Sequence, residues 1–142
     1  VAGELGLAVK VDVGFENIRQ RSPLDTFTDV SGRELAALFA ASDKPTTIVS
    51  TAYPTLMGRE VIDAANRRSN VFFNLIYTDS FTDGQLEDCL KQYTAKRLCL
   101  GTQTPFRYIE PQYVKLFCTE AVDDERREDI LYRNLAQRIK GC

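Results

Sequence analysis

The chain has 142 residues, a length typical of one domain, and we expect residues 1–142 to fold as a single unit. It contains 44% hydrophobic and 27% charged residues, as globular proteins do, and its net charge is -2. That charge offers no electrostatic basis for binding nucleic acid or an anionic membrane, and no apolar run approaches the roughly 20 residues that span a bilayer. We therefore expect neither nucleic acid nor membrane as a partner.

The four cysteines, Cys89, Cys99, Cys118 and Cys142, form no C-x-x-C pair. This spacing argues against a zinc knuckle, and a disulfide framework is unusual in a chain with this much core. We interpret this pattern of cysteines as typical of a protein in a reducing, cytoplasmic environment. The opening residues from Val1 to Glu4 show no initiator Met and no signal peptide pattern, so the sequence starts like the interior of a longer protein.

Four β-branched and apolar runs predict strands, separated by segments with helical spacing. The predicted strands are Ala8–Val13, Thr46–Thr51, Val71–Ile76 and Arg97–Gly101. Near-continuous apolar strands that alternate with helices are typical of a parallel sheet covered by helices. The sequence therefore predicts an α/β fold of four strand–helix units.

Start and stop signals locate the helices between these strands. Ser31 and Glu34 form an S-x-x-E capping box, and the helix after it should end near Ser42, before Pro45. Thr82 and Gln85 form a second candidate box. Further helices are expected over residues 56–67, over Glu110–Cys118 with Pro111 in the first turn, and after an Asp123 N-cap.

In parallel sheets of this kind, chemistry is located at the C-terminal ends of the strands. Those ends read Val11-Asp12-Val13-Gly14-Phe15, Val49-Ser50-Thr51-Ala52-Tyr53-Pro54, Leu75-Ile76-Tyr77 and Leu100-Gly101-Thr102-Gln103-Thr104-Pro105-Phe106. Together with the final segment, which contains Ile130-Leu131-Tyr132-Arg133-Asn134, this series resembles the second half of the amidohydrolase-2 family. That family includes decarboxylases of the aminocarboxymuconate-semialdehyde type.

The resemblance implies a TIM (βα)8 barrel, of which this chain would be the C-terminal half. It also implies a catalytic divalent metal, zinc, held by histidines at the fifth and sixth strands, with a catalytic aspartate at the eighth. Those positions correspond here to Asp12, Thr51 and Gln103, and the chain contains no histidine. Gln103 cannot transfer a proton, and one carboxylate does not hold zinc. We therefore expect the metal to be absent and regard these three residues as altered site positions, or alternatively as plain polar strand ends.

Three residues in the loops after the strands are candidates for substrate binding. Arg19 could hold a carboxylate, while Tyr53 and Phe106 could line an aromatic pocket. The alternatives are a solvated loop charge and ordinary packing. Ser50 and Cys99 would need a basic partner to act as nucleophiles.

Three functions remain open. The first is a non-catalytic half-barrel that serves as a scaffold or interaction subunit. The second is the C-terminal half of a metal-dependent hydrolase or decarboxylase whose active site another chain completes. The third is a doubly wound, receiver-like domain that uses Asp12 or Asp79.

A half-barrel would leave its inner face open to water, a face formed by Val11, Val13, Val49, Phe73 and Leu75 or by their alternates. We therefore expect either self-association into an eight-stranded barrel or association with a complementary half-barrel chain.

Overall fold

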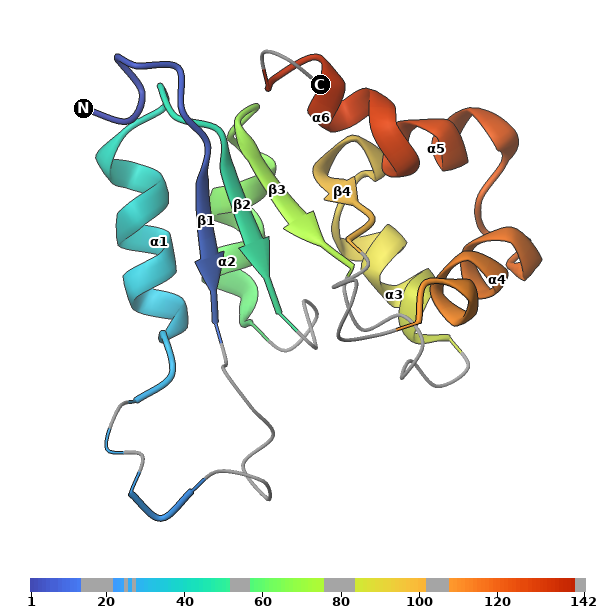
Figure 1. The fold of residues 1–142 in the computed structure, drawn as a ribbon, viewed down its shortest axis with the longest axis horizontal. Coiled ribbons are helices and arrows are strands. Elements are labelled where there is room, and N and C mark those ends of the chain that lie inside the picture. The colour runs from blue at the N-terminus through green and yellow to red at the C-terminus, as the bar shows by residue number, and fades with distance from the viewer. Residues whose placement is uncertain are drawn as a thin grey trace.

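A computed structural model describes residues 1–13, 22–24, 26, 28–51, 57–75, 84–101 and 108–139. The strands are β1 (Val9–Asp12), β2 (Thr47–Ser50), β3 (Val71–Asn74) and β4 (Leu98–Cys99). The helices are α1 (Gly32–Ala41), α2 (Arg59–Asn66), α3 (Gln85–Gln92), α4 (Glu110–Cys118), α5 (Asp124–Glu128) and α6 (Asn134–Ala136), with the 3-10 helix η3 (Ala95–Arg97) and the π-helix η4 (Asp129–Arg133). Each strand lies within its predicted range but is shorter (Figure 1).

The four strands form one parallel sheet in the order β1-β2-β3-β4. Consecutive parallel strands joined by helices are the arrangement of half a (βα)8 barrel, which confirms the predicted α/β fold class. A receiver-like domain has its second strand at the edge, outside the first. The observed strand order therefore does not fit the hypothesis of a receiver-like domain.

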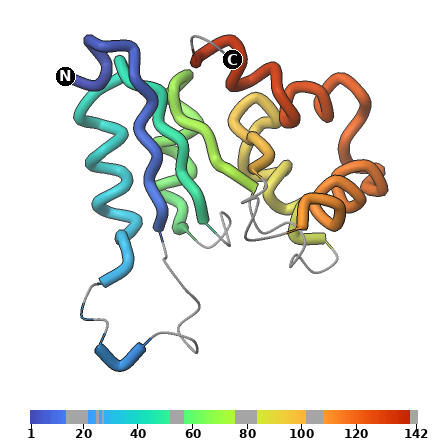
Figure 2. The backbone as a smooth tube through the Cα atoms, viewed as in Figure 1, coloured from blue at the N-terminus to red at the C-terminus, as the bar shows by residue number. Residues whose placement is uncertain are grey.

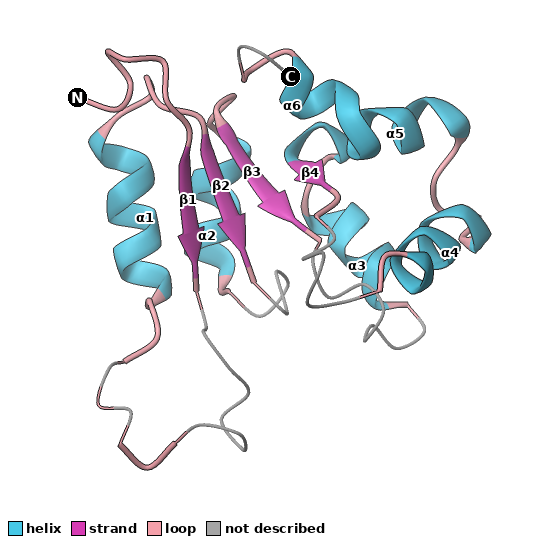
Figure 3. Cartoon of the chain, in the orientation of Figure 1, coloured by secondary structure: helices cyan, strands magenta, loops and turns pink. Residues whose placement is uncertain are grey.

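The helices form an arc around one side of the sheet (Figure 3). A single apolar cluster joins Val49, Phe73 and Leu98 on three strands to residues of α1, α2, α3, α4 and η4. Val49, Phe73 and Leu98 are in register, so their side chains share one face of the sheet. The core therefore lies between this face and the helices.

The predicted inner-face residues belong to this core. Val13, Val49, Phe73 and Leu75 are buried in the helix-side cluster, and Val11 packs against it. Their alternates occupy the opposite face, where Lys10 and Asp12 are exposed, Ile48 is half-buried, and Ser50 and Phe72 are buried. The first set is therefore covered by the helices and does not face water.

Helix boundaries follow local chemistry in most places. Ser31 caps α1, since its side chain accepts from Glu34 N while the Glu34 carboxylate accepts from Ser31 N at 2.8 Å. Asp123 caps α5 by accepting from Arg126 N at 2.8 Å. The second expected capping box was wrong, because the N-cap of α3 is Gly84, in a left-handed conformation with φ 85. Thr82 lies outside the described residues.

The terminal segment is one run of helix, from α5 through η4 to α6, that lies beside β4 (Figure 2). Among the described residues, no helix is both long and apolar enough to cross a membrane.

Candidate functional site

Four residues from the four strands form a row across the sheet, which we call the strand-end row. Asp12 is paired in register with Ser50, Ser50 with Asn74, and Asn74 with Cys99. Side chains in register on parallel strands share one face, and here it is the face opposite the helices. In a complete barrel this face forms the interior, so the row lies at the end of the sheet where (βα)8 enzymes hold their chemistry.

Asp12 is the one carboxylate of the row, and it is exposed. The Lys10 ammonium, two residues earlier on the same face, lies 2.8 Å from Asp12 Oδ1 and 3.0 Å from Oδ2. This contact pairs the only carboxylate of the row with a cation at an exposed position.

The buried Ser50 and the half-buried Asn74 form the centre of the row. The Asn74 amide donates to Ser50 Oγ over 3.3 Å, and Ser50 is 1% exposed. A Cβ atom at position 101 would overlap the Asn74 side chain, so Gly101 permits this close approach. Asn74 Oδ1 is buried and accepts no hydrogen bond from the described residues. Neither residue offers a base that could activate a nucleophile.

Cys99 ends the row on β4. Its thiol is 3% exposed and donates to the Phe73 carbonyl oxygen over 3.6 Å. Burial raises the pKa of Cys99 to about 12, because the thiolate would lose its hydration. The thiol is therefore neutral near pH 7 and is a poor nucleophile and a poor metal ligand.

Thr51 does not join the row. It follows β2 by one residue, and its hydroxyl donates over 3.6 Å to the sulfur of Met57, which packs against the helix-side core. The residue of β2 that is paired in register with Asp12 is Ser50, not Thr51. Gln103, Arg19, Tyr53 and Phe106 lie outside the described residues, so their roles stay predictions.

The row does not fit zinc. A zinc site needs about four imidazole, thiolate or carboxylate ligands, whereas the row presents a paired carboxylate, a hydroxyl, an amide and a neutral thiol. Within the part of the chain that the structure describes, no three His, Cys, Asp or Glu side chains are grouped as metal ligands. We derive no metal-dependent step from these residues.

Sequence reasoning missed Ser50 as a row member and Asn74 altogether. The sequence pattern could have indicated both. Ser50 lies two residues after Ile48 and so shares its face of the strand, not the face of Val49, and Asn74 is a polar residue inside the apolar run Val71-Phe72-Phe73-Asn74-Leu75. A polar side chain in a strand that is buried on both faces needs a hydrogen-bond partner, and here Asn74 and Ser50 bond to each other.

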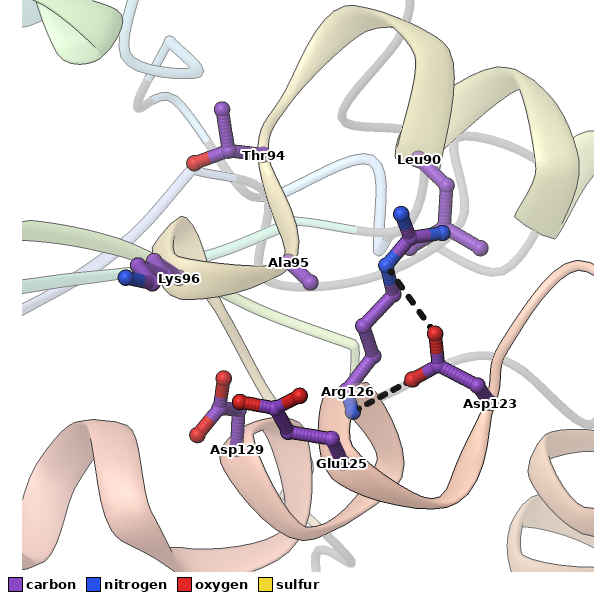
Figure 4. Close-up of a pocket in the computed structure, with 8 residues that line it drawn as sticks. All are labelled: Leu90, Thr94, Ala95, Lys96, Asp123, Glu125, Arg126 and Asp129. Atoms are coloured by element: carbon purple, nitrogen blue, oxygen red, sulfur yellow. Dashed lines mark hydrogen bonds and ion pairs between the residues drawn. The ribbon is translucent and has the colours of Figure 1, made fainter.

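A hollow with a volume of about 580 Å³ lies between η3 and the terminal helical segment (Figure 4). It is lined by Leu90, Thr94, Ala95, Lys96, Asp123, Glu125, Arg126 and Asp129. Arg126 is held by Asp123, whose carboxylate oxygen lies 3.6 Å from Arg126 Nε. Because η3 precedes β4, this hollow is near the beginning of the strand, away from the strand-end row.

Comparison with solved structures gives one match, an amidohydrolase 2 from Bifidobacterium longum subsp. infantis, with a TM-score of 0.63 and 14% sequence identity. The match covers 96% of this chain and 51% of that chain, so the present chain spans about half the length of its structural neighbour. No protein-family model and no curated protein matches the sequence. At this identity the likeness establishes a shared fold, an amidohydrolase-like α/β arrangement.

Proposed function

We propose that this chain is an amidohydrolase-like half-barrel that forms a single domain, has lost its metal ligands, and serves as a non-catalytic interaction subunit. The observation that carries the proposal is the chemistry of the strand-end row. Its only carboxylate, Asp12, is paired with Lys10 at 2.8 Å, and its thiol has a pKa raised to about 12 by burial. Such a row offers too few ligands to hold a zinc ion.

The interaction role is supported by the incompleteness of the sheet. The chain corresponds to 51% of its structural neighbour, and four parallel strands leave a sheet with two ends rather than a closed ring. Sheet edges attract further strands unless they are covered. The occupant would be a second copy of the chain or a complementary half-barrel.

The three cysteines that the structure describes as free, Cys89, Cys99 and Cys118, support placement in a reducing compartment such as the cytoplasm.

The test is metal content measured together with mass in solution. Purified chain, incubated with excess zinc and then desalted, should retain well under one zinc per chain. Stoichiometric zinc that is lost in Asp12→Asn would overturn the non-catalytic assignment. The triple variant D12H/T51H/Q103D should raise zinc affinity if the family positions are correctly assigned. A variant that carries Ser50→His in place of Thr51→His tests the row that the structure defines.

A second function has one observation in its favour. Asp12 is exposed at the end of the edge strand β1, where a residue from a complementary half could join it. In that case the chain would be the C-terminal half of a metal-dependent hydrolase or decarboxylase. Turnover that appears only when a partner half is added, and that Asp12→Asn abolishes, would favour this function.

A further inference from the structure

The two edges of the sheet are not equivalent, and the β4 edge is already occupied. Cys99 O accepts from Leu75 N on β3, so the backbone groups of Leu98 and Leu100 point away from the sheet. Leu98 O accepts from the Asn134 side chain at 2.8 Å, and Leu100 N donates to Ile130 O at 3.0 Å. The terminal helix thus supplies the partners that a neighbouring strand would otherwise provide.

The π-helical turn makes this capping feasible. Asn134 N donates to Asp129 O, five residues back, rather than to Ile130 O, four residues back. That shift leaves the Ile130 carbonyl available for Leu100. A strand that joined the β4 edge would have to break both the Leu100–Ile130 and the Leu98–Asn134 hydrogen bonds.

The β1 edge is open in the described part of the chain. Val9 N donates to Thr46 O and Val13 N to Ser50 O, so the alternate residues, Lys10 and Asp12, direct their backbone groups away from β2. Across residues 1–13, 28–51 and the other described ranges, no backbone partner is found for either residue on that side. This is the side on which a strand can be added.

We propose that two copies of this chain associate through their β1 strands, aligned antiparallel about a two-fold axis at Val11. The inference rests on the proposed role as an interaction subunit and identifies the partner and the surface. The strand Val9-Lys10-Val11-Asp12-Val13 is self-complementary in this register, because Lys10 of each copy lies opposite Asp12 of the other. Both residues present outward backbone groups, so about four backbone hydrogen bonds form across the axis.

This arrangement differs from closure into an eight-stranded ring, which needs β4 of one copy to pair with β1 of the next. The ring would break the contacts of Ile130 and Asn134 with β4, whereas the β1–β1 pairing leaves them intact. It also replaces the exposed Lys10–Asp12 ion pair within each copy by a pair between the copies, so the dimer keeps two ion pairs in all.

Sedimentation equilibrium of the purified chain across micromolar concentrations tests the proposal. We expect a species of twice the 16.0 kDa chain mass. Lys10→Glu and Asp12→Lys each create two like-charge pairs across the axis, so each variant alone should weaken the dimer at least tenfold. The two variants mixed together should form a heterodimer, and the double variant K10D/D12K should recover self-association. Lys91→Glu, which breaks the matched exposed Lys91–Asp88 pair on α3, should leave the dimer unchanged.

The outcomes separate this inference from the function on which it rests. A dimer that is insensitive to both charge reversals would overturn the β1 pairing and leave the interaction role standing. A dimer strengthened by Asn134→Ala, which frees the β4 edge, and unchanged by Lys10→Glu would point to ring closure through β4, against the inference. A monomer at every concentration would overturn the inference, and an added N-terminal half-barrel that binds this monomer would still support the interaction role.

Discussion

Leu100 on the last strand and Ile130 on the terminal helix are joined by a backbone hydrogen bond of 3.0 Å from Leu100 N to Ile130 O. The bond connects residues 30 positions apart and ties a helix to the edge of a sheet, because a π-helical turn leaves the Ile130 carbonyl available. The Asn134 amide reinforces it by donating to Ala95 O and Leu98 O, both at 2.8 Å. The predictions below test this junction and the strand-end row.

Asn134→Ala should destabilise the fold by about 1–3 kcal/mol, because two carbonyl groups lose their shared donor. Urea denaturation followed by circular dichroism measures the change. Asn66→Ala is the matched control, since Asn66 donates to a single carbonyl, that of Gln92, at an exposed position, and its loss should cost less than about 1 kcal/mol. Equal effects for the two variants would show that Asn134 has no special role at the junction.

Gly101→Ala should cost about 1–3 kcal/mol, because the new methyl group overlaps the Asn74 side chain. In an Asn74→Ala background the same substitution should cost less than half as much, since the obstruction is gone. A double-mutant cycle built from thermal or urea unfolding measures the coupling. Additive effects of the two substitutions would contradict the close contact.

Cysteine labelling should follow burial. In the native protein at pH 8, iodoacetamide should modify the exposed Cys118, while Cys89 and Cys99 should react only after unfolding. Peptide mass spectrometry after a timed quench assigns each site. Rapid native labelling of Cys99 would contradict its burial at the end of the row.

The same thiols predict a loss of stability in alkali. Burial raises the pKa of Cys89 and of Cys99 from 9.0 to about 12, so the unfolded chain releases these protons first. Their contribution to stability is fully present below pH 9 and is lost as the pH rises towards 12. The free energy of unfolding measured from pH 8 to pH 11 should fall less steeply in the double variant C89A/C99A.

An acid-sensitive contact links α3 to the end of α4. Thr119 Oγ1 donates to Glu87 Oε1 at 2.6 Å, and this hydrogen bond holds the pKa of Glu87 below its ordinary value of 4.5. The stabilisation is present above pH 4.5 and is lost as the pH falls through the lowered pKa.

Thr119→Val should therefore reduce the free energy of unfolding at pH 7 by about 1 kcal/mol or less, because solvent screens this exposed carboxylate. The difference from the unchanged protein should shrink below pH 4. Thr94→Val is the control, since Thr94 makes no side-chain capping bond to η3. A deficit that persists unchanged at low pH would show that the introduced valine side chain disturbs packing rather than a charge-assisted hydrogen bond.

The order and type of the elements could be predicted from the sequence, because they depend on local chemistry. Apolar runs set the four strands, and the Ser31–Glu34 box set the start of α1, since its two hydrogen bonds join residues three positions apart. The failure at α3 has the same local origin, because the N-cap is Gly84 in a left-handed conformation rather than Thr82.

What the sequence by itself determined was a parallel α/β chain of four units with no histidine to hold a metal. In β1 the alternation of valines with Lys10 and Asp12 already distinguishes the two faces. In β3 only the tertiary structure decided that Phe73 rather than Phe72 faces the helices, because an apolar run carries no difference between its two faces. It was the parallel register that aligned Asp12 with Ser50 rather than Thr51. The capping of β4 by Ile130 and Asn134 joins residues at least 30 positions apart, a distance at which a sequence pattern holds no geometric information.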